Sequence, residues 1–164
     1  MIGQSVVYET LDRLGISYSY TEHPAAATIE EGRPYWAELP GTHCKNLFFR
    51  NHKGNRHYLV IFQCDHNLAI HDLEQLLHQG KLSFASEQRM ERYLGLRPGS
   101  VSPFGLLNDR EHHVYVFLDE ALKGYTHLSF HPNDNRASLN IKFEDFVKYM
   151  DSTGNGYEWI RLYD

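Results

Sequence analysis

Histidine and cysteine are the residue types in this sequence that most readily bind metals, and the chain holds 11 histidines and two cysteines. Zinc sites need converging ligands, usually supplied as closely spaced pairs. His112 and His113 are adjacent and would point to opposite faces of a strand, and neither Cys44 nor Cys64 belongs to a CxxC pair. The HExxH motif is absent as well. We therefore predict neither a metal site nor a metal cofactor.

Motifs for covalent catalysis and for nucleotide cofactors are also missing. The segment Gly99–Pro103 does not have the spacing of a GxSxG nucleophile elbow, and the chain has neither a P-loop nor a GxGxxG motif. Cys44 lies beside Lys45, which could lower a thiol pKa, but buried cysteines are usually inert. The remaining candidates are Lys45 with Asn46, the loop after Gly99, and His131. Each of these, taken alone, also fits an ordinary structural role.

Charge is distributed unevenly along the chain, whose net charge is −5. Residues 1–40 carry two arginines against six acids, whereas residues 41–57 contain no acid and four basic residues, namely Lys45, Arg50, Lys53 and Arg56. A basic patch on an acidic protein favours a partner with a few phosphates over general nucleic-acid binding. The alternative is a solvated hairpin with ordinary surface lysines and arginines.

Length and composition limit the class of protein. A chain of 164 residues with 41% hydrophobic and 13% aromatic residues fits one domain with a buried core. No apolar run approaches the ~20 residues that a membrane helix needs, and the first residues do not resemble a secretory signal. Two cysteines cannot form a disulfide framework. We expect a single domain over residues 1–164, a monomer, located in the cytoplasm.

Hydrophobic spacing and turn residues predict the elements of the first half. A helix is expected over residues 5–14 with Gly15 as its stop, followed by a strand running toward His23. Thr28 and Glu31 fit a capping box, and the helix that they begin would be limited by Gly32 and Pro34. Residues 46–50 and 58–63 flank a turn cluster and predict a hairpin.

The second half alternates short helices and strands without a regular βαβ pattern. Helices are expected over residues 72–79, capped by Asp72 and ended at Gly80, over 86–94 and over 143–150. Strands are expected over residues 82–85 and 113–118, a shaped loop over 97–108, and a second hairpin from 128–130 and 137–141. The fold class is therefore α/β, with one mixed, largely antiparallel sheet.

Three blocks of the sequence resemble the YbaK-type aminoacyl-tRNA editing domains. Gly41–Phe49 resembles the G-x-x-x-K-N-L-F-L stretch of that family, and Gly99–Asn108 resembles its G-x-x-x-P loop. Phe130–Asn135 is similar to the F-H-P-N-D-N turn of one branch, the free-standing prolyl-tRNA editing proteins. The blocks occur in the family's order, and the resemblance runs from about Ser5 to Tyr149. It implies a curved central sheet with flanking helices.

The resemblance also implies an activity, namely hydrolysis of the ester that links mischarged alanine to tRNA(Pro). A proline site cannot exclude the smaller alanine, because missing methylenes supply only about 1–3 kcal/mol each, so a second and smaller sieve is needed. The partners implied are the acceptor end of tRNA(Pro) and prolyl-tRNA synthetase. In this family the terminal ribose hydroxyl is thought to assist, so we assign no side chain as the general base.

The implied roles fall into three groups. The catalytic group is Lys45, Gly99 and His131, in which the loop amides stabilise an oxyanion, Lys45 anchors a phosphate or the ester carbonyl, and His131 positions the substrate. The substrate-binding group is Asn46, Ser100, Val101, Ser102, Pro103 and Thr28. The group that would follow acceptor-stem phosphates is Arg50, Lys53 and Arg56.

Two segments depart from the family pattern. Gly32–Trp36 replaces a smoother helical continuation in the region that helps to form the amino-acid pocket, and residues 154–164 match no family motif. Three alternative functions therefore stay open: a non-catalytic tRNA- or synthetase-binding module, an editing hydrolase for serine, cysteine or threonine, and a metal-dependent hydrolase.

Overall fold

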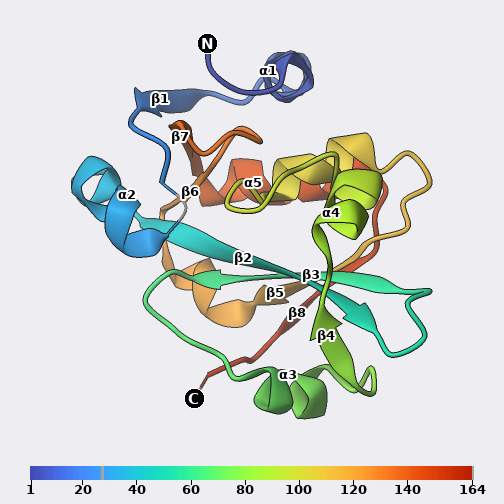
Figure 1. Ribbon diagram of the computed structural model, residues 1–164. Coiled ribbons are helices and arrows are strands. Elements are labelled where there is room, and N and C mark those ends of the chain that lie inside the picture. The colour runs from blue at the N-terminus through green and yellow to red at the C-terminus, as the bar shows by residue number, and fades with distance from the viewer. Residues whose placement is uncertain (27, 164) are drawn as a thin grey trace.

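The computed structural model describes residues 1–26 and 28–163 (Figure 1). Its helices are α1 (Ser5–Leu14), α2 (Ile29–Trp36), α3 (Ile70–Leu77), α4 (Glu87–Leu94) and α5 (Phe143–Thr153), with 3-10 helices η1 (Pro103–Asn108) and η2 (Glu120–Gly124). Its strands are β1 (Tyr18–Glu22), β2 (Thr42–Asn51), β3 (His57–Gln63), β4 (Leu82–Phe84), β5 (Tyr115–Asp119), β6 (His127–Phe130), β7 (Ala137–Lys142) and β8 (Tyr157–Ile160). Within the described residues, no helix is long and apolar enough to cross a membrane.

The eight strands form one sheet in the order β1-β7-β6-β2-β3-β5-β8, with β4 paired to β2 beside that path. Four of the strand pairings are antiparallel and three are parallel. The α/β class with a mixed sheet is therefore confirmed, and both hairpins, β2–β3 and β6–β7, lie where the turn residues predict them.

Successive residues of β3 alternate between two apolar layers, as the pleat of a strand requires. Leu59 and Ile61 belong to the larger cluster, which also includes residues of α1, α5 and η1, whereas Val60 and Phe62 belong to a second cluster with Leu73 of α3. Figure 1 shows α1, α4 and α5 on one side of the strands and α3 on the other. The sheet is thus covered on both faces and holds its strand ends in fixed positions.

One edge of β2 is only partly paired with other strands, and the candidate site lies at the gap in this pairing. β2 pairs with β3 from Cys44 to Arg50, but on its other edge it pairs with β6 only at Thr42 and His43 and with β4 only from Phe49 to Asn51. In the part of the chain that the structure describes, no strand pairs with this edge between residues 44 and 48. The sheet therefore opens in the middle of its longest strand.

Two helix predictions are wrong at their boundaries. α2 continues through Gly32 and Pro34 to Trp36, because the buried Trp36 ring lies directly over Gly32 and fixes that last turn. α3 begins at Ile70 rather than Asp72 and ends at Leu77, and the next residue, His78, adopts a left-handed conformation with φ 55°. The buried Leu73 and Leu77 indicate the extent of that helix better than the expected cap Asp72 and the expected stop Gly80 do.

The helix caps at other ends agree with the sequence. Gly15 and Gly95 end α1 and α4 in left-handed conformations, and the side chains of Thr28 and Ser86 accept hydrogen bonds from backbone amides at the starts of α2 and α4. Sequence analysis missed β8, which lies in the tail without a family motif and pairs in parallel with β5. Half-buried side chains and only four residues give that strand a weak pattern.

Candidate functional site

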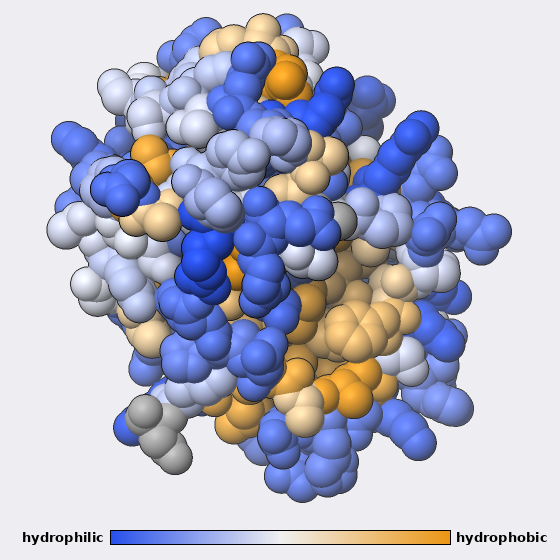
Figure 2. Space-filling model, turned by 60° about the vertical axis from the view of Figure 1, so that its left-hand side comes forward, coloured by the Kyte–Doolittle hydropathy of each residue, from blue (hydrophilic) through white to orange (hydrophobic). Residues whose placement is uncertain are grey.

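A cavity of about 530 Å³ lies at the open edge of β2. Its lining comes from α2, from β2, from the segment after β3, from the loop before η1 and from the turn after β6: Ala26, Thr28, Ile29, Glu30, Arg33, Trp36, His43, Cys44, Lys45, Asn46, Leu47, Cys64, Asp65, Asn67, Gly99, Val101 and His131. The lining mixes charged and amide side chains with apolar ones, and Figure 2, which turns the side that carries α2 forward, shows mostly hydrophilic side chains with an apolar area at the lower right. The cavity is thus a pocket of mixed polar and apolar character.

The structure brings together the three segments that sequence analysis singled out. Lys45, Gly99 and His131 all line the cavity, as do three of the predicted substrate-binding residues, namely Asn46, Val101 and Thr28. These segments are far apart in the chain, so their meeting depends on the order of β6, β2 and the loop before η1.

Three other residues of the predicted group do not line the cavity. Ser102 is fully buried, and its hydroxyl accepts a hydrogen bond from the Phe104 amide. The Pro103 carbonyl accepts a hydrogen bond from the buried Tyr149 hydroxyl at 2.7 Å. Ser100 is buried and its amide closes a turn onto the Arg97 carbonyl. Their contacts shape the loop from behind, whereas Gly99 and Val101 face the cavity.

Lys45 reaches the cavity from the open stretch of β2. Its ammonium donates a hydrogen bond to Asn67 Oδ1 at 3.2 Å, and its side chain is half-buried. An ammonium carries three donors, so this single contact orients the group and leaves donors for a ligand. The aliphatic part of such a side chain commonly lies along apolar surface while the charged end stays wet.

The Gly99 loop offers backbone donors. Gly99 has φ 83°, a left-handed conformation that glycine adopts without steric cost. Across residues 1–26 and 28–163, the amides of Gly99 and Val101 have no hydrogen-bond partner, and both residues line the cavity. Backbone amides that are free to donate at the wall of a pocket are suited to bind an anion or a developing oxyanion.

His131 is held as a neutral ring. Its Nδ1–H donates to the Ala137 carbonyl at 2.8 Å, and burial lowers the pKa of the imidazole below its ordinary value. A neutral imidazole that donates through Nδ1 keeps a lone pair on Nε2. His131 therefore presents an acceptor, and not a positive charge, to whatever occupies the cavity.

Sequence analysis missed an aromatic stack in the cavity wall. Trp36 and His43 lie ring on ring, with centroids 3.9 Å apart and planes 7° apart, and both are buried. Burial first, and then the neighbouring His131 and His23, lower the pKa of His43 well below its ordinary value. Neither residue gave a signal, because His43 lies in the basic segment and Trp36 lies in the segment that departs from the family.

Two further pairs bear on the chemistry of the cavity. Arg33 and Asp65 form an exposed salt bridge at 2.6 Å, and hydrogen bonds from Gln63 and then Arg33 lower the pKa of Asp65. Cys44 and Cys64 are both buried, and burial raises the pKa of both thiols. A thiol with a raised pKa is a poor nucleophile at neutral pH.

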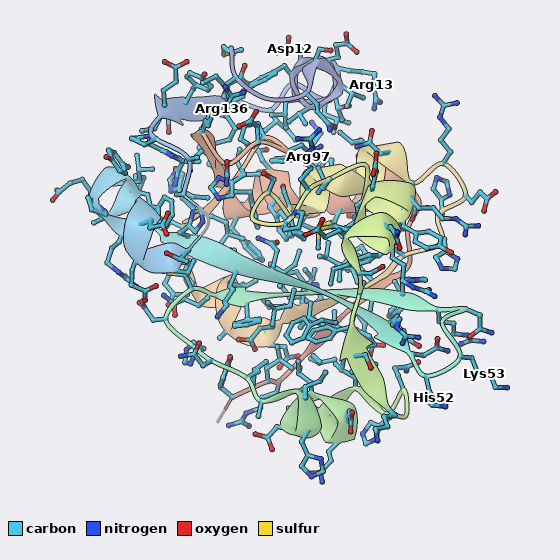
Figure 3. All side chains as sticks on the ribbon, viewed as in Figure 1. Asp12, Arg13, His52, Lys53, Arg97 and Arg136 are labelled. Carbon is cyan, nitrogen blue, oxygen red and sulfur yellow. The ribbon has the colours of Figure 1, made fainter. Side chains whose placement is uncertain are left out.

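The three residues expected to contact acceptor-stem phosphates lie away from the cavity. Arg50, Lys53 and Arg56 belong to the β2–β3 hairpin, whose tip, with Lys53, lies at the far end of these strands from α2 (Figure 3). At about 3.3 Å per residue, the strand carries the chain about 20 Å from Lys45 to Asn51. Within the described residues, no group of three or more histidine, cysteine or acidic side chains is placed to hold a metal ion.

Comparisons with known proteins give matches over most of the chain. The family model of the aminoacyl-tRNA editing domain matches residues 23–149. The chain is 40% identical over 162 residues to the prolyl-tRNA editing protein ProX of Acetoanaerobium sticklandii, covering 99% of each chain. It is 35% identical over 147 residues to the prolyl-tRNA synthetase associated domain-containing protein 1 of Danio rerio, covering 88% of this chain and 79% of that one. A solved structure of a candidate trans-editing enzyme for prolyl-tRNA synthetase has the same fold, with a TM-score of 0.69, 22% identity and 94% of both chains covered.

Proposed function

This chain belongs to the family of aminoacyl-tRNA editing domains, and we propose that it is a free-standing deacylase that removes alanine from mischarged tRNA(Pro). The observation that carries the proposal is the meeting of Lys45, the Gly99 loop and His131 in one cavity. The names of the relatives support tRNA(Pro) as the tRNA. Alanine follows from the need for a sieve that a proline-sized side chain cannot enter.

The reaction is the hydrolysis of an ester. Water attacks the carbonyl carbon of the aminoacyl group, the bond from that carbon to the ribose oxygen breaks, and the ribose oxygen ends with a proton from water. Negative charge develops on the carbonyl oxygen during the attack. The unpaired amides of Gly99 and Val101 are the groups that would stabilise it, since fixed donors need no rearrangement as the charge forms.

Lys45 supplies the fixed positive charge of the site. Its ammonium would contact either the terminal phosphate of the tRNA or the ester carbonyl, with Asn67 holding the side chain in place. His131, held neutral, would accept a hydrogen bond from the α-ammonium group of the amino acid through Nε2. Asn46, whose amide nitrogen is bonded to the Cys44 carbonyl, would position the same group.

The proposed partners follow from the charge at each end of β2. The acceptor end of tRNA(Pro) would enter the cavity while Arg50, Lys53 and Arg56 contact phosphates of the acceptor stem. The name of the Danio rerio relative supports an association with prolyl-tRNA synthetase. We also propose that the whole chain acts as one monomeric domain, because β1 and β8, outside the family match, pair within the same sheet.

A panel of tRNA(Pro) molecules charged with alanine, serine, cysteine, threonine or proline tests this function. We expect rapid loss of labelled alanine and slow loss of proline, measured against buffer alone and with EDTA present. Loss of serine, cysteine or threonine instead of alanine would keep the reaction and change the substrate. Binding of the charged tRNA without loss of any amino acid would identify a non-catalytic module.

A further inference from the structure

We propose that the stacked pair Trp36 and His43 is the part of the cavity that limits the size of the amino acid. This inference rests on the proposed function, because it assigns the specificity of the same site. It concerns a wall of the pocket and not the reacting groups, which are the loop amides and Lys45.

The stack is in the right place to set the size of the pocket. Both residues line the cavity, and the imidazole of His131 meets both rings edge to face, with centroids 5.3 Å from His43 and 6.1 Å from Trp36. If His131 contacts the amino acid, as proposed above, the stack is the next surface that the amino-acid side chain meets. A proline ring extends farther from the α-carbon than a methyl group does, so the ring would meet this wall first.

The stack is also rigid. Gly32 lies against the indole ring of Trp36, and a Cβ added at Gly32 would lie 1.5 Å from that ring. Any larger residue at position 32 must therefore displace the ring. His43 is held in β2, between β6 and β3, by backbone pairing on both sides. A wall can exclude a larger side chain only if it does not yield, and interiors packed this closely transmit strain and do not absorb it.

The stack also buries two ring nitrogens without hydrogen-bond partners among the described residues. Trp36 Nε1 and His43 Nδ1 are buried and, among residues 1–26 and 28–163, lack any hydrogen-bond partner. Proteins rarely leave such atoms unsatisfied, and exceptions call for an explanation. Both rings line the cavity, so the cost of these unpaired atoms is a second sign that the stack serves the occupant of the cavity and not only the core.

The test measures binding and hydrolysis separately. Adenosine carrying alanine or proline through a non-hydrolysable 3′-amide is titrated into the wild type and into Trp36→Ala, Trp36→Phe and Gly32→Ala. The hydrolysis of Ala-tRNA(Pro) and Pro-tRNA(Pro) is measured in parallel. Tyr35→Ala, on the same helix but exposed, and Gly124→Ala, where a Cβ would meet nothing within 4 Å, are the matched controls.

We expect Trp36→Ala to improve the binding and hydrolysis of the proline compound relative to the alanine compound by about tenfold or more, as for a change of one or two methylenes in a pocket. Trp36→Phe should have a smaller effect in the same direction. Gly32→Ala keeps the indole but moves it, so it should change the ratio even though alanine is the better helix former. The two controls should leave the ratio as in the wild type.

The outcomes separate this inference from the proposed function. If folded Trp36→Ala and Gly32→Ala, checked by thermal unfolding, keep the wild-type ratio in both assays, the stack does not set the size limit. If the wild type hydrolyses neither ester, the proposed function fails. The amide titration then still decides whether the stack discriminates between the two amino acids.

Discussion

The two ends of the β2–β3 ladder each hold a pair of neighbouring histidines, of which His57, His43 and His131 are buried and His113 is half-buried, and the pairs differ in their hydrogen bonds. At the hairpin end, His57 Nδ1 lies 2.9 Å from His113 Nε2, and Arg89 donates to His57 Nε2 at 3.0 Å. At the cavity end, His43 and His131 meet edge to face, and His43 Nδ1 has no partner among the described residues. One pair is satisfied by hydrogen bonds within the protein, and the other is not.

We interpret the hairpin end of the ladder as structural and the cavity end as functional. The hairpin also satisfies its own turn, because Asn51 Oδ1 accepts hydrogen bonds from the amides of Asn55 and Arg56. The cavity end keeps unpaired amides at Gly99 and Val101 and an unpaired strand edge. Unpaired polar groups cost stability where they are buried, as Trp36 Nε1 and His43 Nδ1 are, typically about 1–3 kcal/mol each. Where a fold keeps several of them together, a ligand that pairs with them is the expected reason.

Lys45→Ala is the change expected to have the largest effect, and it acts only on the cavity end. Removing one fixed charge or donor from such a site typically lowers the rate about 100-fold or more. Among the described residues the Lys45 ammonium has one hydrogen-bond partner, Asn67, so the melting temperature should change little. The measurement is the deacylation of Ala-tRNA(Pro) beside thermal unfolding.

Two comparisons sharpen the Lys45 prediction. Lys45→Arg should recover only part of the rate, since a planar guanidinium does not replace a compact ammonium. Lys53→Ala, at the hairpin tip, removes the same charge from the other end of the ladder and should keep most of the rate at saturating tRNA. Turnover close to wild type in a folded Lys45→Ala protein would contradict the assignment of the site.

The cavity end also marks the limit of prediction from the sequence. Lys45, Gly99 and His131 lie in motifs with a family pattern, and turn residues place both hairpins. The Trp36–His43 stack was not predictable, because it depends on Gly32 accommodating a ring four residues later and on α2 lying against β2. β8 was not predicted for a related reason: its four residues form a strand because they pair with β5, and their sequence has no strand pattern of its own.

Acidification should destabilise the protein, and His57 of the hairpin pair should contribute to this loss. Burial, and then His113 and the nearby arginines, lower the pKa of His57 from its ordinary value to about 4. Between about pH 6.5 and 4 the unfolded chain therefore binds a proton that the folded protein does not, so the free energy of unfolding falls as the pH falls through this range. Each pKa unit corresponds to about 1.4 kcal/mol, which makes a loss of a few kcal/mol the expected scale.

His57→Phe tests this assignment, because it keeps the ring packing against Phe48 and Tyr93 but cannot bind a proton. Denaturant unfolding at several pH values should give a flatter profile than the wild type. Part of the slope should remain, since His43 and His131 also have lowered pKa values. The exposed His71 provides the control, and a wild-type slope in His57→Phe would assign the acid sensitivity to the cavity end.

Reversing the charges of the hairpin should weaken tRNA binding about tenfold and leave the chemistry intact. Lys53→Glu with Arg56→Glu removes two cations that lie far from the cavity, so the rate at saturating tRNA should stay close to wild type. The slope of log affinity against log salt should become shallower by about one for each phosphate that these two side chains neutralise. If the affinity and the slope are unchanged, the acceptor stem does not contact the β2–β3 hairpin.

Chelation should have the smallest effect, and the reason lies in how both histidine pairs are held. A metal ligand must offer a lone pair. The imidazole nitrogens that could offer one at the hairpin end accept hydrogen bonds instead, His57 Nε2 from Arg89 and His113 Nε2 from His57. At the cavity end His43 stacks on the Trp36 ring, and His131 donates to the Ala137 carbonyl through Nδ1. Among the described residues, no third histidine, cysteine or acidic side chain is placed to complete a metal site with these two histidines. Overnight dialysis against EDTA should therefore leave the deacylation rate unchanged. Activity that is lost on dialysis and restored by zinc would show that the cavity histidines serve a metal, and the contrast between the two ends would then need a different explanation.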